Sequence, residues 1–206
     1  MKIVFFGDSI TEGWFEESSP IDYEEVYHRK LAQLWNRTDI EIINAGVGGD
    51  SAEKGYARIE RDVISHQPDM AVVCFGLNDA SRGEEHLTGY LAVMEVIFRR
   101  LEGIQTIFMT PNMFNTYVHP DTAERLKDYA RVTAEAQNSG IMDRYMQGAA
   151  ACAEKNRVPV CDCYREWKKL RRYGIDTDLL LANHINHPTR KMHWLFADKL
   201  YETISL

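Results

Sequence analysis

The sequence has no long apolar run, which argues against a membrane-spanning helix. Its apolar stretches, such as residues 70–75, end far short of the roughly 20 residues that a membrane-spanning helix needs. The first apolar run, residues 3–6, ends at a glycine and an aspartate, whereas a signal peptide needs a longer apolar core and a small-residue cleavage site. We therefore expect no membrane span, no signal peptide and a cytoplasmic location.

Basic residues and cysteines are also scarce. The 24 Lys and Arg residues are outnumbered by 31 Asp and Glu residues, which leaves a formal charge of −7. A chain of this charge gains little from a phosphate backbone, so nucleic acid is not an expected partner. The four cysteines do not form two pairs at zinc-binding spacing and suit a reduced chain. Without repeats or linkers, residues 1–206 fit one domain, and a homo-oligomer is compatible with this composition.

Short apolar runs alternate with longer amphipathic stretches along the chain. Strands are predicted at residues 3–6, 40–43, 70–75, 106–109 and 158–161. Helices are predicted at residues 22–35, 51–66, 87–101, 121–156 with a break near 139–140, 163–173 and 189–203. Because strands that alternate with helices pair in parallel and are covered on both faces, the pattern predicts an α/β fold. We expect a three-layer α/β/α, flavodoxin-like domain with a parallel five-stranded sheet.

Glycine-rich polar segments follow the first three predicted strands, at residues 7–13, 44–51 and 76–79. Sites in open parallel sheets form at the carboxyl ends of the strands, so these segments should meet at one edge. Ser9 follows the first strand on a tight turn, where its hydroxyl could act as a nucleophile if a base lies within reach. The N–H groups of Ser9 and Gly49 and the amide of Asn78 could hold a developing oxyanion.

Seven histidines could supply the base. On local grounds His187 is the best candidate, because it lies in a predicted loop directly before Pro188. His119 is a weaker loop candidate. Three others fall on predicted helices and are expected at the surface: His28, His66 and His86.

The polar segments resemble the sequence blocks of the SGNH hydrolases, also called the GDSL esterase/lipase family. The resemblance extends from residue 7 to about residue 198, and its blocks are Gly7-Asp8-Ser9, Gly46-Val47-Gly48-Gly49-Asp50-Ser51, Gly76-Leu77-Asn78-Asp79 and His187-Pro188. It implies a serine esterase with Ser9 as nucleophile and His187 as general base. It also implies an oxyanion hole formed by the N–H groups of Ser9 and Gly49 and by Asn78, and no cofactor or metal.

The sequence departs from this family at one position. Members usually carry an aspartate three residues before the histidine, and His184 stands there. An imidazole cannot stabilise an imidazolium as a carboxylate does. Asn183, Asp176, Asp178 or a backbone carbonyl could orient His187 instead, and a Ser–His dyad can still work because the base still takes the serine proton.

The resemblance covers several classes of ester. Family members hydrolyse acetylated sugars, lysophospholipids, thioesters and aryl esters. The acidic and aromatic residues 14–20 suit a sugar-bearing alcohol. We expect a short acyl group such as acetyl on a carbohydrate or another small alcohol. Four apolar residues in predicted loops are candidates to border the site: Phe15, Met113, Phe114 and Tyr117.

Three alternatives to this esterase remain open. A lysophospholipase or thioesterase would belong to the same family. A non-catalytic binding module of this fold could hold a phosphate or flavin, although residues 7–13 lack the glycine pattern and lysine of nucleotide-binding loops. Because the usual aspartate is missing, such a module could also be a catalytically impaired enzyme that binds a sugar or acyl group. His184, His187 and His193 could instead bind a metal, although their spacing is a weak signal.

Overall fold

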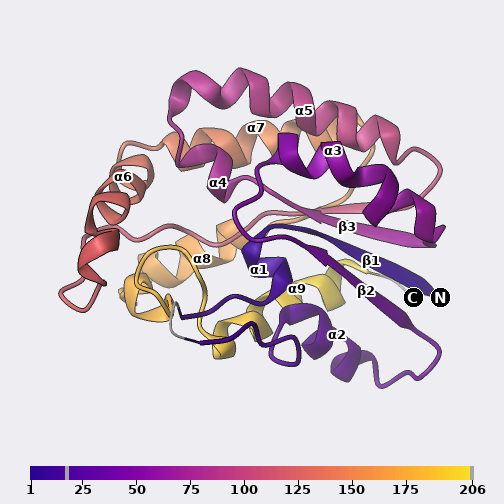
Figure 1. Ribbon diagram of the computed structural model, residues 1–206, viewed down its shortest axis with the longest axis horizontal. Coiled ribbons are helices and arrows are strands. Elements are labelled where there is room, and N and C mark those ends of the chain that lie inside the picture. Colours follow the sequence, from indigo (N-terminus) through magenta and orange to yellow (C-terminus); the bar gives the residue numbers. More distant parts are fainter. Residues whose placement is uncertain (17–18, 205–206) are drawn as a thin grey trace.

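The computed structural model describes residues 1–16 and 19–204, and its framework is a five-stranded parallel sheet (Figure 1). The strands are β1 Lys2–Gly7, β2 Glu41–Gly46, β3 Met70–Cys74, β4 Gln105–Met109 and β5 Val160–Cys161. Their order, β2-β1-β3-β4-β5, is that of flavodoxin-type sheets. The predicted fold class is therefore confirmed.

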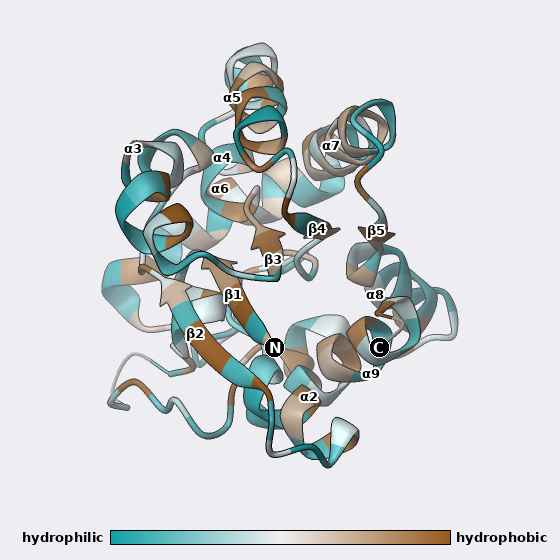
Figure 2. Cartoon of the chain, turned by 90° about the vertical axis from the view of Figure 1, so that its right-hand side faces the viewer, coloured by the Kyte–Doolittle hydropathy of each residue, from teal (hydrophilic) through white to brown (hydrophobic). Residues whose placement is uncertain are grey.

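Helices cover both faces of the sheet, which gives three layers (Figures 1 and 2). One layer contains α3 Ala52–Asp62, α5 Leu87–Arg100 and α7 Ile141–Lys155, and the other contains α2 Tyr27–Trp35, α8 Cys163–Arg172 and α9 His193–Thr203. The remaining helices are α1 Ser9–Glu12, α4 Leu77–Ala80 and α6 Lys127–Asn138. Within residues 1–16 and 19–204, no helix is long and apolar enough to cross a membrane.

The core lies on both sides of the central strands. Every residue of β3 is fully buried, and so is the apolar run Ile3 to Phe6 of β1. A strand buried on both faces needs continuous rather than alternating apolar residues, and these two strands have that pattern.

Several predicted boundaries differ from the observed ones. The first long helix begins at Tyr27 rather than at residue 22, because the N–H of Asp22 donates to the carbonyl of Gly13 and holds the chain in a loop. The strand predicted at 158–161 has only two residues. The break near residues 139–140 is confirmed, since Gly140 takes the left-handed backbone conformation between α6 and α7.

The expectation that His28 lies at the surface is wrong. Its side chain is buried, and Nε2 lies 3.2 Å from the carbonyl oxygen of Thr11. Helix α2 packs closely against α9, so His28 faces the interior. The sequence places His28 on a helix but does not reveal which side of that helix is covered.

The strand register aligns the segments that follow the first three strands. Gly7 pairs with Gly46 of β2 and with Cys74 of β3, so the following loops start at the same level. Helix α1 passes close to the end of β2, where a Cβ on Gly46 would lie 2.2 Å from the backbone nitrogen of Glu12. Only a glycine fits at this contact.

We predict that Gly46→Ala lowers the free energy of unfolding by about 1–3 kcal/mol, the usual cost of overpacking. The matched control is Gly89→Ala in α5, where a Cβ would meet no atom within 4 Å. The control should raise the free energy of unfolding by about 0.5–1 kcal/mol, because alanine is the better helix former. Urea unfolding measures both. Equal effects of the two substitutions would contradict this account of the contact between α1 and β2.

Candidate functional site

Ser9 is the first residue of α1 and lies directly beyond the end of β1. Asp8 stands between the two elements, and its Oδ1 accepts the N–H of Ile10 at 3.0 Å, so it caps the short helix. The cap fixes the turn that places Ser9 at the carboxyl edge of the sheet. Only 8% of Ser9 is exposed, and this residue lines a cleft.

His187 connects Ser9 to a backbone carbonyl. Its Nε2 lies 2.9 Å from Oγ of Ser9, and its Nδ1 lies 3.1 Å from the carbonyl oxygen of Phe15. A carbonyl oxygen can only accept a hydrogen bond, so Nδ1 must carry the proton. Nε2 is then the acceptor for the Ser9 hydroxyl, which is the tautomer that a general base needs.

Arg190 anchors the segment that supplies this carbonyl. Its guanidinium lies 4.5 Å from the centre of the Phe15 ring. Nη1 donates to both carboxylate oxygens of Glu16 at 2.9 Å, and Nε donates to Asp22 at 3.3 Å. The Phe15 ring also packs on His193, with 4.8 Å between the ring centres. The position of the carbonyl is therefore set by ion pairs and packing, and sequence analysis had not singled out Arg190 or Glu16.

The side chains considered as partners of the His187 ring contact other groups. Oδ1 of Asn183 accepts the backbone N–H groups of residues 185, 186 and 187 at 2.9–3.0 Å, so it shapes the loop that carries His187. Asp178 is fully buried and accepts the N–H groups of Thr116 and Tyr117 at 2.7 and 3.1 Å. Of the alternatives considered, the backbone carbonyl is the one that meets the ring.

The three C-terminal histidines do not form one metal-binding group. His184 stacks on His119, with 4.0 Å between ring centres, rather than facing His187. Nδ1 of His193 accepts the N–H of Tyr27 at 3.1 Å inside the core. In the described part of the chain these histidines belong to three separate environments, so they do not support the metal site first considered for them.

The expected oxyanion donors lie around the same cleft. Ser9, Gly49, Asn78 and His187 all line it. Nδ2 of Asn78 donates to the carbonyl of Asp50 at 2.9 Å and more weakly to Oδ2 of Asp8 at 3.5 Å. The first bond holds the amide in place, while the second is long enough that an oxyanion can compete for its N–H.

A buried arginine ties the first two strand ends together beneath this site. Arg58 donates to the carbonyls of Gly7 and Ala45 at 2.8 Å each and to the carboxylate of Asp50 at 2.7 Å. A buried charge is stable only when it is paired and hydrogen-bonded, and Arg58 meets that condition. Sequence analysis had missed it, because an arginine on a helix does not by itself reveal that it points inward.

Burial shifts the pKa values of three groups in or beside the site. It raises the pKa of Asp8 to about 7, helped by the nearby carboxylates of Asp79 and Asp50. It also raises the pKa of Asp79 to about 6, against the hydrogen bonds from the N–H of Ala52. Burial lowers the pKa of His187 to about 4, which the bond to the Phe15 carbonyl only partly opposes. His187 is therefore neutral near pH 7 and able to accept a proton.

The cleft above Ser9 and His187 has a volume of about 720 Å³. Its remaining lining residues are Glu12, Trp14, Val47, Gly48, Gly49, Asn78, Arg125, Leu126, Tyr129, Asn183, Ile185 and Asn186. The aromatic side chains of Trp14 and Tyr129 thus line a cleft that offers both apolar and polar groups. Glu12 accepts N–H groups from both Trp14 and Gly48, at 2.8 and 2.6 Å, and so links the first loop to the second.

The four apolar residues expected to border the site do not line this cleft. Phe15, Met113 and Phe114 are buried in the core, and the hydroxyl of Tyr117 donates to Asp176. Of the acidic and aromatic residues 14–20, Trp14 lines the cleft, while residues 17 and 18 lie outside the described part of the chain.

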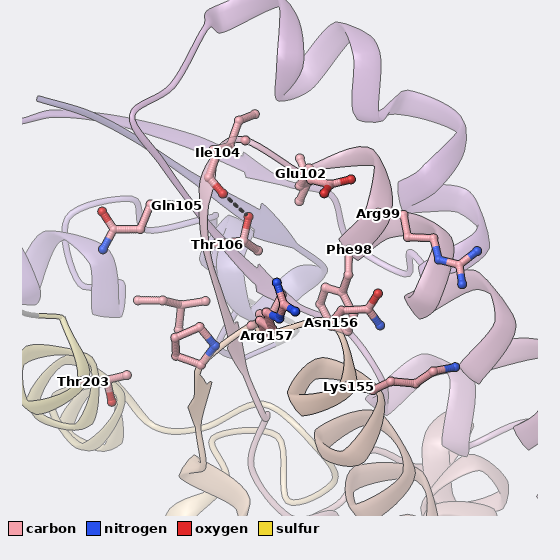
Figure 3. A pocket seen from close by; sticks show the side chains of 15 residues that line it. Phe98, Arg99, Glu102, Ile104, Gln105, Thr106, Lys155, Asn156, Arg157 and Thr203 are labelled. Carbon is pink, nitrogen blue, oxygen red and sulfur yellow. Dashed lines mark hydrogen bonds between the residues drawn. The ribbon is translucent and has the colours of Figure 1, made fainter.

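A second pocket of about 700 Å³ lies where β4 and β5 begin, at the opposite edge of the sheet (Figure 3). Its polar side chains include Arg99, Glu102, Lys155 and Arg157, and no serine, cysteine or histidine lines it. Among the described residues it therefore lacks the paired serine and histidine found in the cleft above Ser9, so that cleft is the candidate site.

Comparison with known proteins identifies the family of this chain. A model of the GDSL-like Lipase/Acylhydrolase family matches residues 5–195. An acetylxylan esterase of Geobacillus stearothermophilus is 29% identical over 169 residues, which cover 69% of this chain and 75% of that protein. An uncharacterized lipoprotein of Bacillus subtilis, YqeF, is 36% identical over 81 residues, which are 38% of this chain and only 32% of the relative's length.

The fold is also found among solved structures. The crystal structure of an acetyl xylan esterase, AlAXEase, superposes on this chain with a TM-score of 0.74 at 22% identity, and each chain is covered over 100% of its length. At this identity the likeness supports the fold, and the chemistry must be argued from the site.

We predict that wild-type protein loses stability relative to Asp8→Asn as the pH rises from about 4 to 7. Burial raises the pKa of Asp8 to about 7 in the folded state, against 3.8 unfolded. Between these values the folded state keeps a proton that the unfolded state releases, so rising pH favours the unfolded state. The difference should change by at most about 1.4 kcal/mol per pH unit.

Urea unfolding at several pH values measures this difference. Asp39→Asn is the control, because an Arg37 hydrogen bond lowers the pKa of that exposed carboxyl and gives no such loss. A difference between wild type and Asp8→Asn that stays constant with pH would contradict the raised pKa.

Proposed function

We propose that this chain, which belongs to the GDSL-like Lipase/Acylhydrolase family, is a serine esterase acting on short acyl esters. The observation that carries the proposal is the 2.9 Å contact between Oγ of Ser9 and Nε2 of His187 inside a cleft. A serine hydroxyl becomes an effective nucleophile when a neutral imidazole stands within hydrogen-bond reach.

The first step is acylation of Ser9. Nε2 of His187 takes the hydroxyl proton while Oγ attacks the ester carbonyl, and the carbonyl oxygen becomes an oxyanion. The N–H groups of Ser9 and Gly49 and the Asn78 amide are the proposed donors to that oxyanion, each worth about 10²–10³ in rate. The imidazolium then gives its proton to the leaving alcohol, and an acyl group remains on Ser9.

The second step returns the free enzyme. Water attacks the acyl group as His187 takes its proton, and the carboxylic acid leaves as Oγ of Ser9 regains a proton. Throughout both steps the carbonyl of Phe15 accepts the Nδ1–H of His187, which keeps the ring in one orientation. A neutral carbonyl stabilises the transient imidazolium less than a carboxylate would, so we expect a slower enzyme than one with a complete triad.

The cleft favours an acetyl or similarly short acyl group on a carbohydrate or other small polar alcohol. Trp14 and Tyr129 offer rings against which a sugar can pack, while Glu12 and Asn186 offer polar contacts beside them. Two proteins similar to this chain carry acetylxylan esterase names. A lysophospholipase or thioesterase with a long acyl chain is the second candidate, favoured by the apolar side chains of Val47, Leu126 and Ile185 in the same cleft.

Other properties of the chain stay predictions from composition and pattern. We expect one domain over residues 1–206, a cytoplasmic location and no nucleic-acid partner, and the composition is compatible with a homo-oligomer. Cell fractionation tests the location, and size-exclusion chromatography tests the assembly.

We predict that Ser9→Ala lowers kcat for p-nitrophenyl acetate by several orders of magnitude, up to about 10⁶, without changing the fold. The matched control is Ser139→Ala, at the exposed end of α6, which should keep full activity. An alkyl phosphonate should label Ser9 alone, as found by peptide mass mapping. Unchanged turnover of a folded Ser9→Ala protein would refute the nucleophile.

A panel of esters separates the two substrate classes. We expect kcat/KM to fall as the acyl chain lengthens from acetyl, and to be higher for acetylated sugars than for simple alkyl acetates. A rise in kcat/KM up to long chains would favour the second candidate. Absence of turnover on every ester, together with retained binding of acetylated sugars, would instead indicate a binding protein of this fold.

A further inference from the structure

A second group of chemically active side chains lies near the candidate active site but plays no part in it. His119, Asp121 and His184 each offer one ligand atom, and these three atoms lie within 4.8 Å of one another. His119 and His184 are half-buried, while the carboxylate of Asp121 is exposed. Two imidazoles and one carboxylate are a common ligand set for zinc-like ions.

The first two ligands are held by a tight turn. The carbonyl of His119 accepts the N–H of Thr122 at 3.0 Å, and Pro120 occupies the second position, where its fixed φ suits such a turn. The N–H of Asp121 also donates to Nδ1 of His119 at 3.2 Å. The turn thus sets the direction of the His119 ring and keeps the carboxylate of Asp121 beside it.

The third ligand comes from a distant part of the chain in an uncommon conformation. His184 has a φ of 57°, which few residues other than glycine adopt. Its ring stacks on His119 with 13° between the ring planes. Within the described residues, Nδ1 of His184 is one of several buried side-chain atoms without a hydrogen-bond partner, so it is available to an ion.

We propose that His119, Asp121 and His184 bind one zinc-class transition-metal ion. Ligand atoms about 2.0–2.1 Å from a tetrahedral zinc lie roughly 3.3 Å apart. The three atoms must therefore close by at most about 1.5 Å from the 4.8 Å limit. The exposed side chain of Asp121 can approach by rotation, and the stacked rings of His119 and His184 must turn so that both ring planes point at the ion. Water would complete the coordination.

The ion would join two loops that serve the candidate active site. His119 and Asp121 belong to the segment between β4 and α6, and His184 lies three residues before His187. Asn183, the neighbour of His184, accepts the backbone N–H of His187. Metal binding would therefore stabilise the loop that carries the proposed base, and it would do so without touching Ser9. The site does not depend on the proposed esterase activity.

Direct metal binding tests this proposal. Chelator-treated protein is titrated with Zn²⁺ by calorimetry and with Co²⁺ by visible absorption. We expect one ion per chain, and visible absorption bands typical of tetrahedral Co²⁺. His119→Asn and His184→Asn should each weaken binding by more than about tenfold, since losing even an outer partner of a metal ligand costs about 10–100-fold.

The variants include their own controls. Asparagine tolerates a positive φ, so His184→Asn should fold, which circular dichroism without metal can verify. His86→Asn removes an exposed histidine elsewhere and should bind Zn²⁺ as wild type does. The proposal is overturned if no ion binds at one per chain, if His119→Asn and His184→Asn bind like wild type, or if His86→Asn loses binding equally.

Discussion

The hydrogen bond from Nδ1 of His187 to the carbonyl of Phe15 is the interaction on which the candidate site depends. It fixes the tautomer, the orientation and hence the 2.9 Å contact between Nε2 and Ser9. The position of a backbone carbonyl depends on the contacts of neighbouring side chains. Arg190 provides that support by pairing with Glu16 and covering the Phe15 ring.

The second constraint is the burial of charge at the carboxyl ends of the strands. Arg58 donates hydrogen bonds to the carbonyls of Gly7 and Ala45 and to Asp50. If the loops that follow β1 and β2 separated, the buried guanidinium would lose these partners. Asp8 sits in the same region with a pKa raised to about 7, mainly because it is buried. The charged form of Asp8 is therefore costly in this buried region, and perturbed pKa values of this kind are common at functional sites.

Much of this architecture could be predicted from the sequence, because continuous apolar strands and glycine-rich loops are local patterns. Ser9, Gly49, Asn78 and His187 do converge on one cleft, as the strand ends suggested. What replaces the aspartate at position 184 could not be predicted, because Phe15 and His187 are 172 residues apart and any residue type offers a carbonyl. The inward direction of the Arg58 and His28 side chains could not be predicted either, because it depends on how the helices pack.

The central claim is that His187 works as a base without a carboxylate partner, and the pH dependence of kcat/KM tests it most directly. With the pKa of His187 lowered to about 4 by burial, acetate release by wild type should rise through about pH 4 and then level off. Asp8→Asn serves as control, since any inflection near pH 7 that belongs to Asp8 disappears in that variant. A rise through a pH above 6.5, the ordinary pKa of histidine, that persists in Asp8→Asn would mean that a negative charge stabilises the imidazolium, and would contradict the account.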